Sequence, residues 1–127
     1  MTAAPPQETT FTPILRRVVE RVPGAVGVIF ADWDGEAVDA YSLADRDQML
    51  VLAAHYGIIL NQLQSALHLF HFGEAIEALF EHDKMCLVLR VVGHGYYVIL
   101  ALDAADGHIA TALREIKFAA DALMVEL

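Results

Sequence analysis

The stretch VLAAHYGIILNQLQSALHLFHF, from Val51 to Phe72, lies at the centre of the chain and decides how the rest is arranged. No Asp, Glu, Lys or Arg occurs between Gln48 and Gly73, although charged residues make up 20 % of the 127-residue sequence. Asp45 and Asp47 come just before it, and carboxylates favour a helix N-terminus because of its partial positive charge. The stretch therefore predicts one long helix with an uncharged surface.

Residues that recur every 3.6 positions divide the surface of this helix into three stripes. The most apolar stripe is expected to lie on a sheet and consists of Met49, Leu52, Tyr56, Ile59, Leu63, Ala66 and Phe70. The second, mixed stripe consists of Val51, His55, Ile58, Gln62, Ser65 and Leu69. The third stripe, small or neutral polar, consists of Ala54, Gly57, Asn61, Gln64 and His68.

An ordinary surface helix would carry Lys and Glu on the second and third stripes. Because this helix does not, we expect a second protein surface to cover it there. The simplest supplier of that surface is the same helix from a second copy, across a two-fold axis. The second stripe is therefore the predicted dimer interface.

The other elements follow from periodicity and turn signals. Thr12-Pro13 predicts a helix start, with Thr12 as its cap, and Pro23-Gly24 predicts its end. Asp34-Gly35 predicts a hairpin. Strands are expected at 25–32, 36–42, 74–81, 85–92 and 96–102, with helix as an alternative for 74–81, and a last helix from Asp106. Short turns between strands make neighbours antiparallel. The sequence thus predicts an α+β fold, a five-stranded antiparallel sheet with helices on its faces.

Length and charge narrow the class of protein. The length predicts one domain, residues 11–127, after a disordered lead at residues 1–10 without a signal peptide. The net charge of −9 argues against nucleic acid as a partner and favours a basic protein surface. Polar groups such as His55 and Asn61 argue against a membrane span. A single cysteine, Cys86, is typical of a cytoplasmic protein without disulfides.

No motif predicts an active site, a cofactor or a metal. The chain has no phosphate-binding loop, and Gly93-His94-Gly95 is too short to be one, so it is interpreted as a turn. His68 and His71 lack the spacing of a zinc motif and are interpreted as helix-end residues. A calcium-binding EF-hand loop needs a Glu at its twelfth position. Counted from Asp32 that position is Leu43, so Asp32–Glu36 is interpreted as a turn. Cys86, inside an apolar run, is interpreted as a packing thiol.

Trp33 lies at the predicted hairpin tip among acids. It could anchor a partner or fold back over its own sheet, and both readings stay open. Most of the surrounding acids (Asp32, Asp34, Glu36, Asp39, Asp45 and Asp47) are expected to form a solvated rim that could steer a basic partner. The predicted partner-binding residues are Asp32, Trp33, Asp34, Ala54, Asn61 and Gln64.

Three segments carry a resemblance to a known family. They are VPGAVGVIFADWDGEAVD (Val22–Asp39), the strands MCLVLRVV and YYVILAL joined by GHG, and the closing LREIKFAADAL. Together with the order of elements, helix-strand-strand-helix-three strands-helix, they resemble the Roadblock family of dynein light chains, in particular its bacterial MglB-like branch. The resemblance implies dimers formed through the long helix and the next strand, so that Ile76 joins the expected interface.

The resemblance also implies a function. Family members act beside Ras-like small GTPases or as scaffolds. We expect a non-enzymatic homodimer, or a dimer with a Roadblock paralogue, that binds a Ras-like GTPase or its regulatory complex, in bacterial polarity or motility, and that modulates GTP hydrolysis or only docks. The alternative is a small-molecule sensor of the PAS or GAF type, with His55, Tyr56 or Cys86 lining a pocket.

Overall fold

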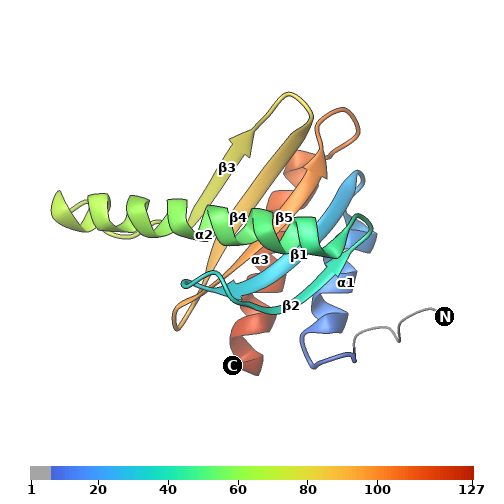
Figure 1. The fold of residues 1–127 in the computed structure, drawn as a ribbon, viewed down its shortest axis with the longest axis horizontal. Coiled ribbons are helices and arrows are strands. Elements are labelled where there is room, and N and C mark those ends of the chain that lie inside the picture. Colours follow the sequence, from blue (N-terminus) through green and yellow to red (C-terminus); the bar gives the residue numbers. More distant parts are fainter. Residues whose placement is uncertain (1–6) are drawn as a thin grey trace.

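The computed structural model describes residues 7–127, which form one sheet with helices on both faces (Figure 1). The helices are α1 (Thr12–Arg21), α2 (Arg46–Leu69) and α3 (Ile109–Glu126). The strands are β1 (Ala25–Asp32), β2 (Ala37–Ser42), β3 (Glu77–Glu81), β4 (Met85–Gly93) and β5 (Tyr96–Asp103). The predicted order αββαβββα is confirmed, and the segment at 74–81 contains a strand, shorter than expected.

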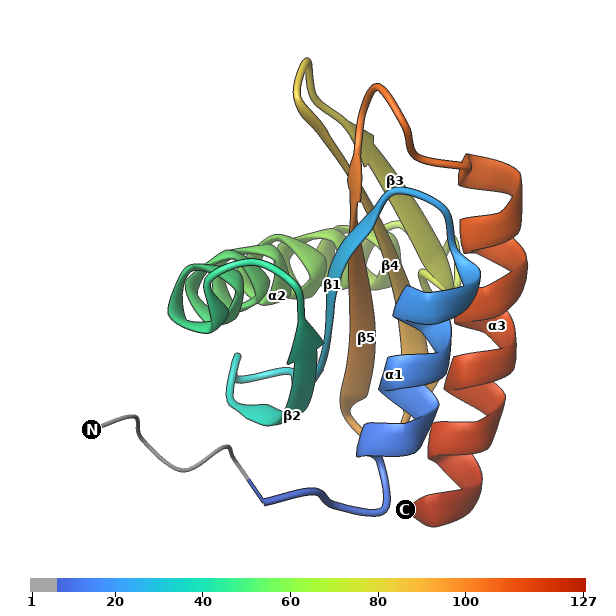
Figure 2. The same ribbon diagram turned by 90° about the vertical axis from the view of Figure 1, so that its right-hand side faces the viewer.

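The sheet has the order β2-β1-β5-β4-β3, and every neighbouring pair is antiparallel. β2 and β3 are therefore its two edges. α2 covers one face, while α1 and α3 lie side by side on the other (Figure 2). The predicted fold class, a five-stranded antiparallel sheet between helices, is confirmed.

Alternate residues of the central strands point to opposite faces and build two cores. Val28, Phe30 and Leu100 pack under α1 and α3. Ile29, Ile99 and their neighbours pack under α2. β5 is buried along almost its whole length, which explains why its sequence is a continuous apolar run.

The face of α2 that lies on the sheet differs from the predicted one. Its buried residues are Met49, Ala53, Gly57, Leu60 and Gln64. Of the stripe that was expected there, Ile59 and Leu63 are each 40 % exposed and Phe70 is 62 % exposed. Met49 of that stripe is buried as predicted, but the prediction is wrong for the later positions. It ranked stripes by their apolar character, whereas two small residues, Ala53 and Gly57, face the sheet at the middle of the helix.

The reason for this rotation is Tyr97 of β5, whose side chain is fully buried. It stands up from the sheet against α2, and its hydroxyl donates a 2.8 Å hydrogen bond to the carbonyl oxygen of Ala53. A Cβ on Gly57 would lie 2.5 Å from the same hydroxyl oxygen. Only glycine leaves room for the ring, so Tyr97 and Gly57 fix which side of the helix faces inward.

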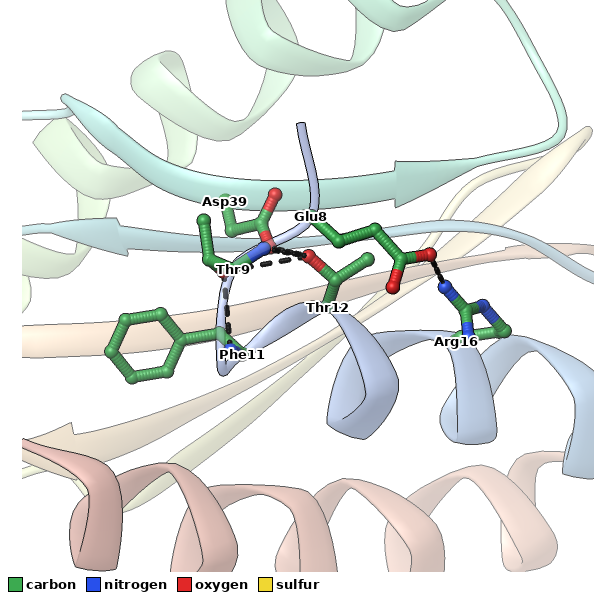
Figure 3. A network of polar contacts seen from close by, with 6 residues as sticks. All are labelled: Glu8, Thr9, Phe11, Thr12, Arg16 and Asp39. Carbon is green, nitrogen blue, oxygen red and sulfur yellow. Dashed lines mark hydrogen bonds and ion pairs between the residues drawn. The ribbon is translucent and has the colours of Figure 1, made fainter. Parts of the chain in front are cut away.

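The start of α1 is tied to β2 by a buried carboxylate (Figure 3). Asp39 accepts hydrogen bonds from the hydroxyls of Thr9, at 2.7 Å, and Thr12. Thr12 is thus the first residue of α1, and its hydroxyl donates to Asp39. It is not the N-cap residue that the sequence predicted, because Phe11 occupies that position. Asp39 is buried rather than part of a solvated rim.

Part of the predicted lead also contacts the domain. Thr9 binds Asp39, and Glu8 forms an ion pair with Arg16 of α1 (Figure 3). The rest of the expected lead, residues 1–6, lies outside the described residues.

The contact between Gly57 and Tyr97 predicts the effect of a methyl group. Gly57→Ala gains about 1 kcal/mol of helix propensity, but overpacking against a buried ring costs about 1–3 kcal/mol. The hydrogen bond to Ala53 is also disturbed. We expect a net loss of about 1–2 kcal/mol in the free energy of urea unfolding.

The control is the same substitution made in a Tyr97→Phe variant, because phenylalanine lacks the hydroxyl oxygen that the new methyl group at position 57 would contact. In that background Gly57→Ala should cost much less, so the two substitutions should be non-additive. Additive costs would show that the hydroxyl does not set the helix position.

A second prediction concerns alkaline pH. Burial, and secondarily the negative charge of Asp32, raises the pKa of Tyr97 from 10.0 to about 12. Between these values the unfolded chain loses the phenolic proton while the folded chain keeps it, so stability falls as pH rises. The loss should reach about 2–3 kcal/mol near pH 12 and be absent below pH 9. Urea unfolding of wild type and Tyr97→Phe from pH 8 to 12 measures it. The gap between the two curves should change over this range only, and a constant gap would contradict the assignment.

Candidate protein-interaction surface

α2 extends beyond the sheet that it packs on. It is 24 residues long, begins at the Asp45 cap, whose carboxylate accepts from the backbone nitrogen of Gln48 at 3.0 Å, and crosses from the β2 edge past β3 (Figure 1). Its C-terminal end therefore overhangs the β3 edge. This overhang contains no Asp, Glu, Lys or Arg, so the exposed surface there is uncharged.

All seven residues predicted for the dimer interface are exposed in the single chain. The large apolar members are Val51 and Ile58, each 58 % exposed, Leu69 at 71 % and Ile76 at 62 %. His55, Gln62 and Ser65 lie on the same outer side of the helix. Exposed apolar side chains are common one at a time, but a contiguous row of them is typical of an interaction surface.

The exposed apolar surface is wider than predicted. Ile59, Leu63 and Phe70 join it because the helix is rotated, and Phe72, 77 % exposed, adds to it beyond the helix end. The rings of Phe70 and Phe72 stack with centroids 6.1 Å apart. The stripe pattern placed the first three on the sheet and did not include Phe72. Ala53 and Gly57 could have corrected this prediction, because two small side chains on one side of the helix leave room for a large residue of the sheet.

β3 continues this surface. It is a five-residue edge strand that pairs only with β4 among the described residues. Its other edge therefore offers backbone N–H and C=O groups next to the overhang of α2. An unpaired edge beside an exposed apolar helix can accept a strand from another chain.

Gln64 has a structural role instead of the predicted partner-binding one. It is 5 % exposed, and its side-chain amide binds the backbone of Ala75 twice, at 2.8 and 3.1 Å. These bonds fasten the segment that returns from the end of α2 to β3. In the single domain Gln64 is therefore not accessible to a partner.

The hairpin between β1 and β2 lies beside the middle of α2. The side-chain amide of Asn61 donates to the carbonyl oxygen of Trp33 at 2.6 Å, and Ala54 lies next to Gly35. The Trp33 ring packs on the core under α2, so of the two readings for this residue the structure shows the one in which it folds back. Its indole nitrogen is buried without a partner among the described residues. Asp32 turns inward to accept two backbone hydrogen bonds at 3.0 Å, and Asp34 is exposed.

The residues of the alternative sensor hypothesis do not share a pocket. Cys86 is buried under α1 and α3, on the opposite face of the sheet from α2. On α2, His55 is exposed, and the Tyr56 hydroxyl lies 2.7 Å from Nε2 of His82. Cys86 therefore lies on the other face of the sheet from His55 and Tyr56, so these residues do not line one common pocket.

The residues of the other motifs lie as follows. His68 lies 3.6 Å from Glu74 in an exposed pair, and the described residues contain no group of three or more His, Cys, Asp or Glu suited to a metal ion. Gly93-His94-Gly95 forms the turn between β4 and β5.

Across residues 7–127, none of the helices has the length and apolar character needed to cross a membrane.

Solved structures share this arrangement. The Roadblock/LC7 domain from Streptomyces avermitilis matches with a TM-score of 0.78 and 20 % sequence identity, covering 87 % of this chain and 91 % of the other. The gliding protein MglB from Thermus thermophilus matches at 0.80 and 16 %, covering 90 % and 85 %. MglC from Myxococcus xanthus matches at 0.67 and 27 %, covering 94 % and 100 %.

The chain has the Roadblock fold. The resemblance inferred from Val22–Asp39 and the later segments is thereby confirmed at the level of the fold. No protein-family model and no curated protein matches the sequence. The Roadblock likeness therefore depends on the three-dimensional arrangement of the elements, with α2 as the long central helix.

Proposed function

We propose that the protein is a Roadblock-type regulator that forms a homodimer along α2 and β3 and binds a Ras-like small GTPase. The observation that carries the proposal is the uncharged, exposed outer side of α2, where Val51, Ile58 and Leu69 lie in one row. Burying such a row against its symmetry mate removes apolar surface from water on both copies. The free edge of β3 adds backbone pairing to the same contact.

The similar structures support an assembly and a regulatory role. One similar structure is an MglB with a tetrameric arrangement, which supports association of this chain with further copies. MglB from Thermus thermophilus is described as a gliding protein. The link to a Ras-like GTPase, and to polarity or motility, comes from the resemblance of the sequence to the bacterial branch of the family.

The hairpin is the proposed contact for the GTPase. Asp34 and Glu36 are exposed at its tip, next to Ala54 and Asn61 of α2. In a protein of net charge −9, this acidic tip fits a basic patch and raises the rate of encounter with it. Arg16, Arg17 and Arg21 lie on α1, on the face of the sheet opposite α2 (Figure 2). Any effect on hydrolysis would therefore come from reshaping the switch loops of the GTPase and not from an arginine finger of α1.

If the outer side of α2 is the dimer interface, a charge introduced there should weaken the dimer. Ile58→Asp should weaken self-association by about a hundredfold or more, because an unpaired carboxylate in a contact costs about 3 kcal/mol or more. Sedimentation velocity across a concentration series measures the dissociation constant. The matched control is Leu43→Asp, which removes a side chain 70 % exposed in the loop before α2. It should leave the constant unchanged. A dimer that survives Ile58→Asp would place the interface elsewhere.

The GTPase proposal predicts nucleotide-dependent binding. The Ras-like GTPases of the protein's own organism, loaded with GDP or a non-hydrolysable GTP analogue, are tested by biolayer interferometry. At least one should bind in only one nucleotide state. Asp34→Arg should weaken that binding about tenfold at low salt, and the same change at Asp121, an exposed residue of α3, should not.

Phosphate-release kinetics then separate activation of hydrolysis from docking alone. If no GTPase of the panel binds in a nucleotide-dependent way, the GTPase proposal fails even if the dimer is confirmed.

A further inference from the structure

α1 and α3 lie side by side on the face of the sheet opposite α2 (Figure 2). Side chains of both helices line a groove between them. Its volume is about 200 Å³, and its lining includes Ile14, Arg17, Val18, Glu115, Phe118 and Ala122. Because α2 lies on the other side of the sheet, the groove stays open when the outer side of α2 is covered. It therefore offers a second surface, independent of the proposed dimer and GTPase contacts.

The solvent-facing side of a surface helix is normally polar, but the rim of this groove is apolar. Phe118 stands at its rim and is 56 % exposed, and Val125, two turns further along α3, is 80 % exposed. Ile14 and Val18 form the opposite wall on α1. Two helices packed side by side leave a channel of the kind that accepts the apolar side of a third helix.

The charge of this layer differs from that of the rest of the protein. α1 and α3 carry five of the eight basic residues and four of the 17 acidic ones. These two helices therefore have a net charge of +1, and the rest of the chain has −10. This layer therefore lacks the negative charge of the rest of the protein, so an acidic partner meets less repulsion here than elsewhere on the surface.

Glu115, at the groove wall, has an unusual environment. It is only 4 % exposed. Its carboxylate oxygens lie 3.9 Å from Nε of Arg17 and 4.0 Å from an Nη of Arg21. A buried carboxylate needs nearby positive charge, so Glu115 holds both guanidinium groups at the rim. Both arginine side chains are 56 % exposed, so their remaining donors face outward.

From these observations we propose that the α1–α3 groove binds an amphipathic, acidic helix of a partner protein. A large apolar side chain of that helix enters between Val18 and Phe118, and a carboxylate about one turn away binds Arg17 and Arg21. A guanidinium group pairs with a carboxylate through two parallel hydrogen bonds, which gives the contact its selectivity for acidic sequences. The apolar wall supplies the burial.

The test uses a phage-displayed library of random 20-residue peptides, selected on the immobilised wild-type protein and depleted on Phe118→Ser. Enriched peptides should carry Asp or Glu three or four residues from a large apolar residue. Synthetic versions are then titrated by fluorescence anisotropy. Arg17→Gln and Phe118→Ser should each raise the dissociation constant about tenfold. The matched control Lys117→Gln, at an exposed position of α3 outside the groove, should change it less than twofold.

Amide chemical shifts of the wild-type protein provide a readout that needs no variant. On peptide addition, the shifted signals should belong to α1 and α3 and not to α2. No groove-dependent enrichment, enrichment of basic peptides, or shifts confined to α2 would each overturn the proposal. A fall in oligomer mass caused by Phe118→Ser would identify a second copy as the occupant and would overturn it as well. Ile58→Asp should not affect peptide binding, so this result is separate from the fate of the dimer.

Discussion

The structure depends on the contact of one tyrosine with one helix. Tyr97 rises from the most buried strand, bonds the carbonyl of Ala53 and occupies the space that a side chain at position 57 would need. This contact fixes the rotation of α2. Rotation in turn decides which residues are buried and which are left for other proteins, so the composition of the outer surface follows from a single position in the sheet.

With the rotation set, α2 has two parts of different character. Near the β2 edge it packs on the sheet and on the hairpin, where Asn61 holds the backbone of Trp33. Beyond the β3 edge it has no sheet beneath it, and the two bonds between Gln64 and Ala75 help to fasten the chain that follows. The first part makes the domain stable, and the second part presents apolar side chains to a partner. The opposite layer, α1 and α3, adds a surface of different charge.

The order and class of the elements could be predicted from the sequence because they depend on local signals. Asp45 marks the start of α2, Asp34-Gly35 marks a hairpin, and continuous apolar runs mark central strands. The packed side of α2 could not be predicted, because Tyr97 lies 44 residues away from Ala53 and its height above the sheet is a property of the fold. Burial of Asp39 has the same origin, since its hydroxyl partners come from a segment 27 to 30 residues earlier. The exposed row Val51, Ile58 and Leu69 was found because the absence of charge is visible in the sequence itself.

The overhang of α2 has a consequence for the lifetime of the protein in a cell. A helix end without a sheet beneath it opens locally at little cost in free energy, and proteases cut chains that open. Association would close this end, so an unassembled copy would be degraded faster than an assembled one. Degradation of unassembled copies would then keep the amount of the protein matched to the amount of the partner that covers Leu69 and Phe72.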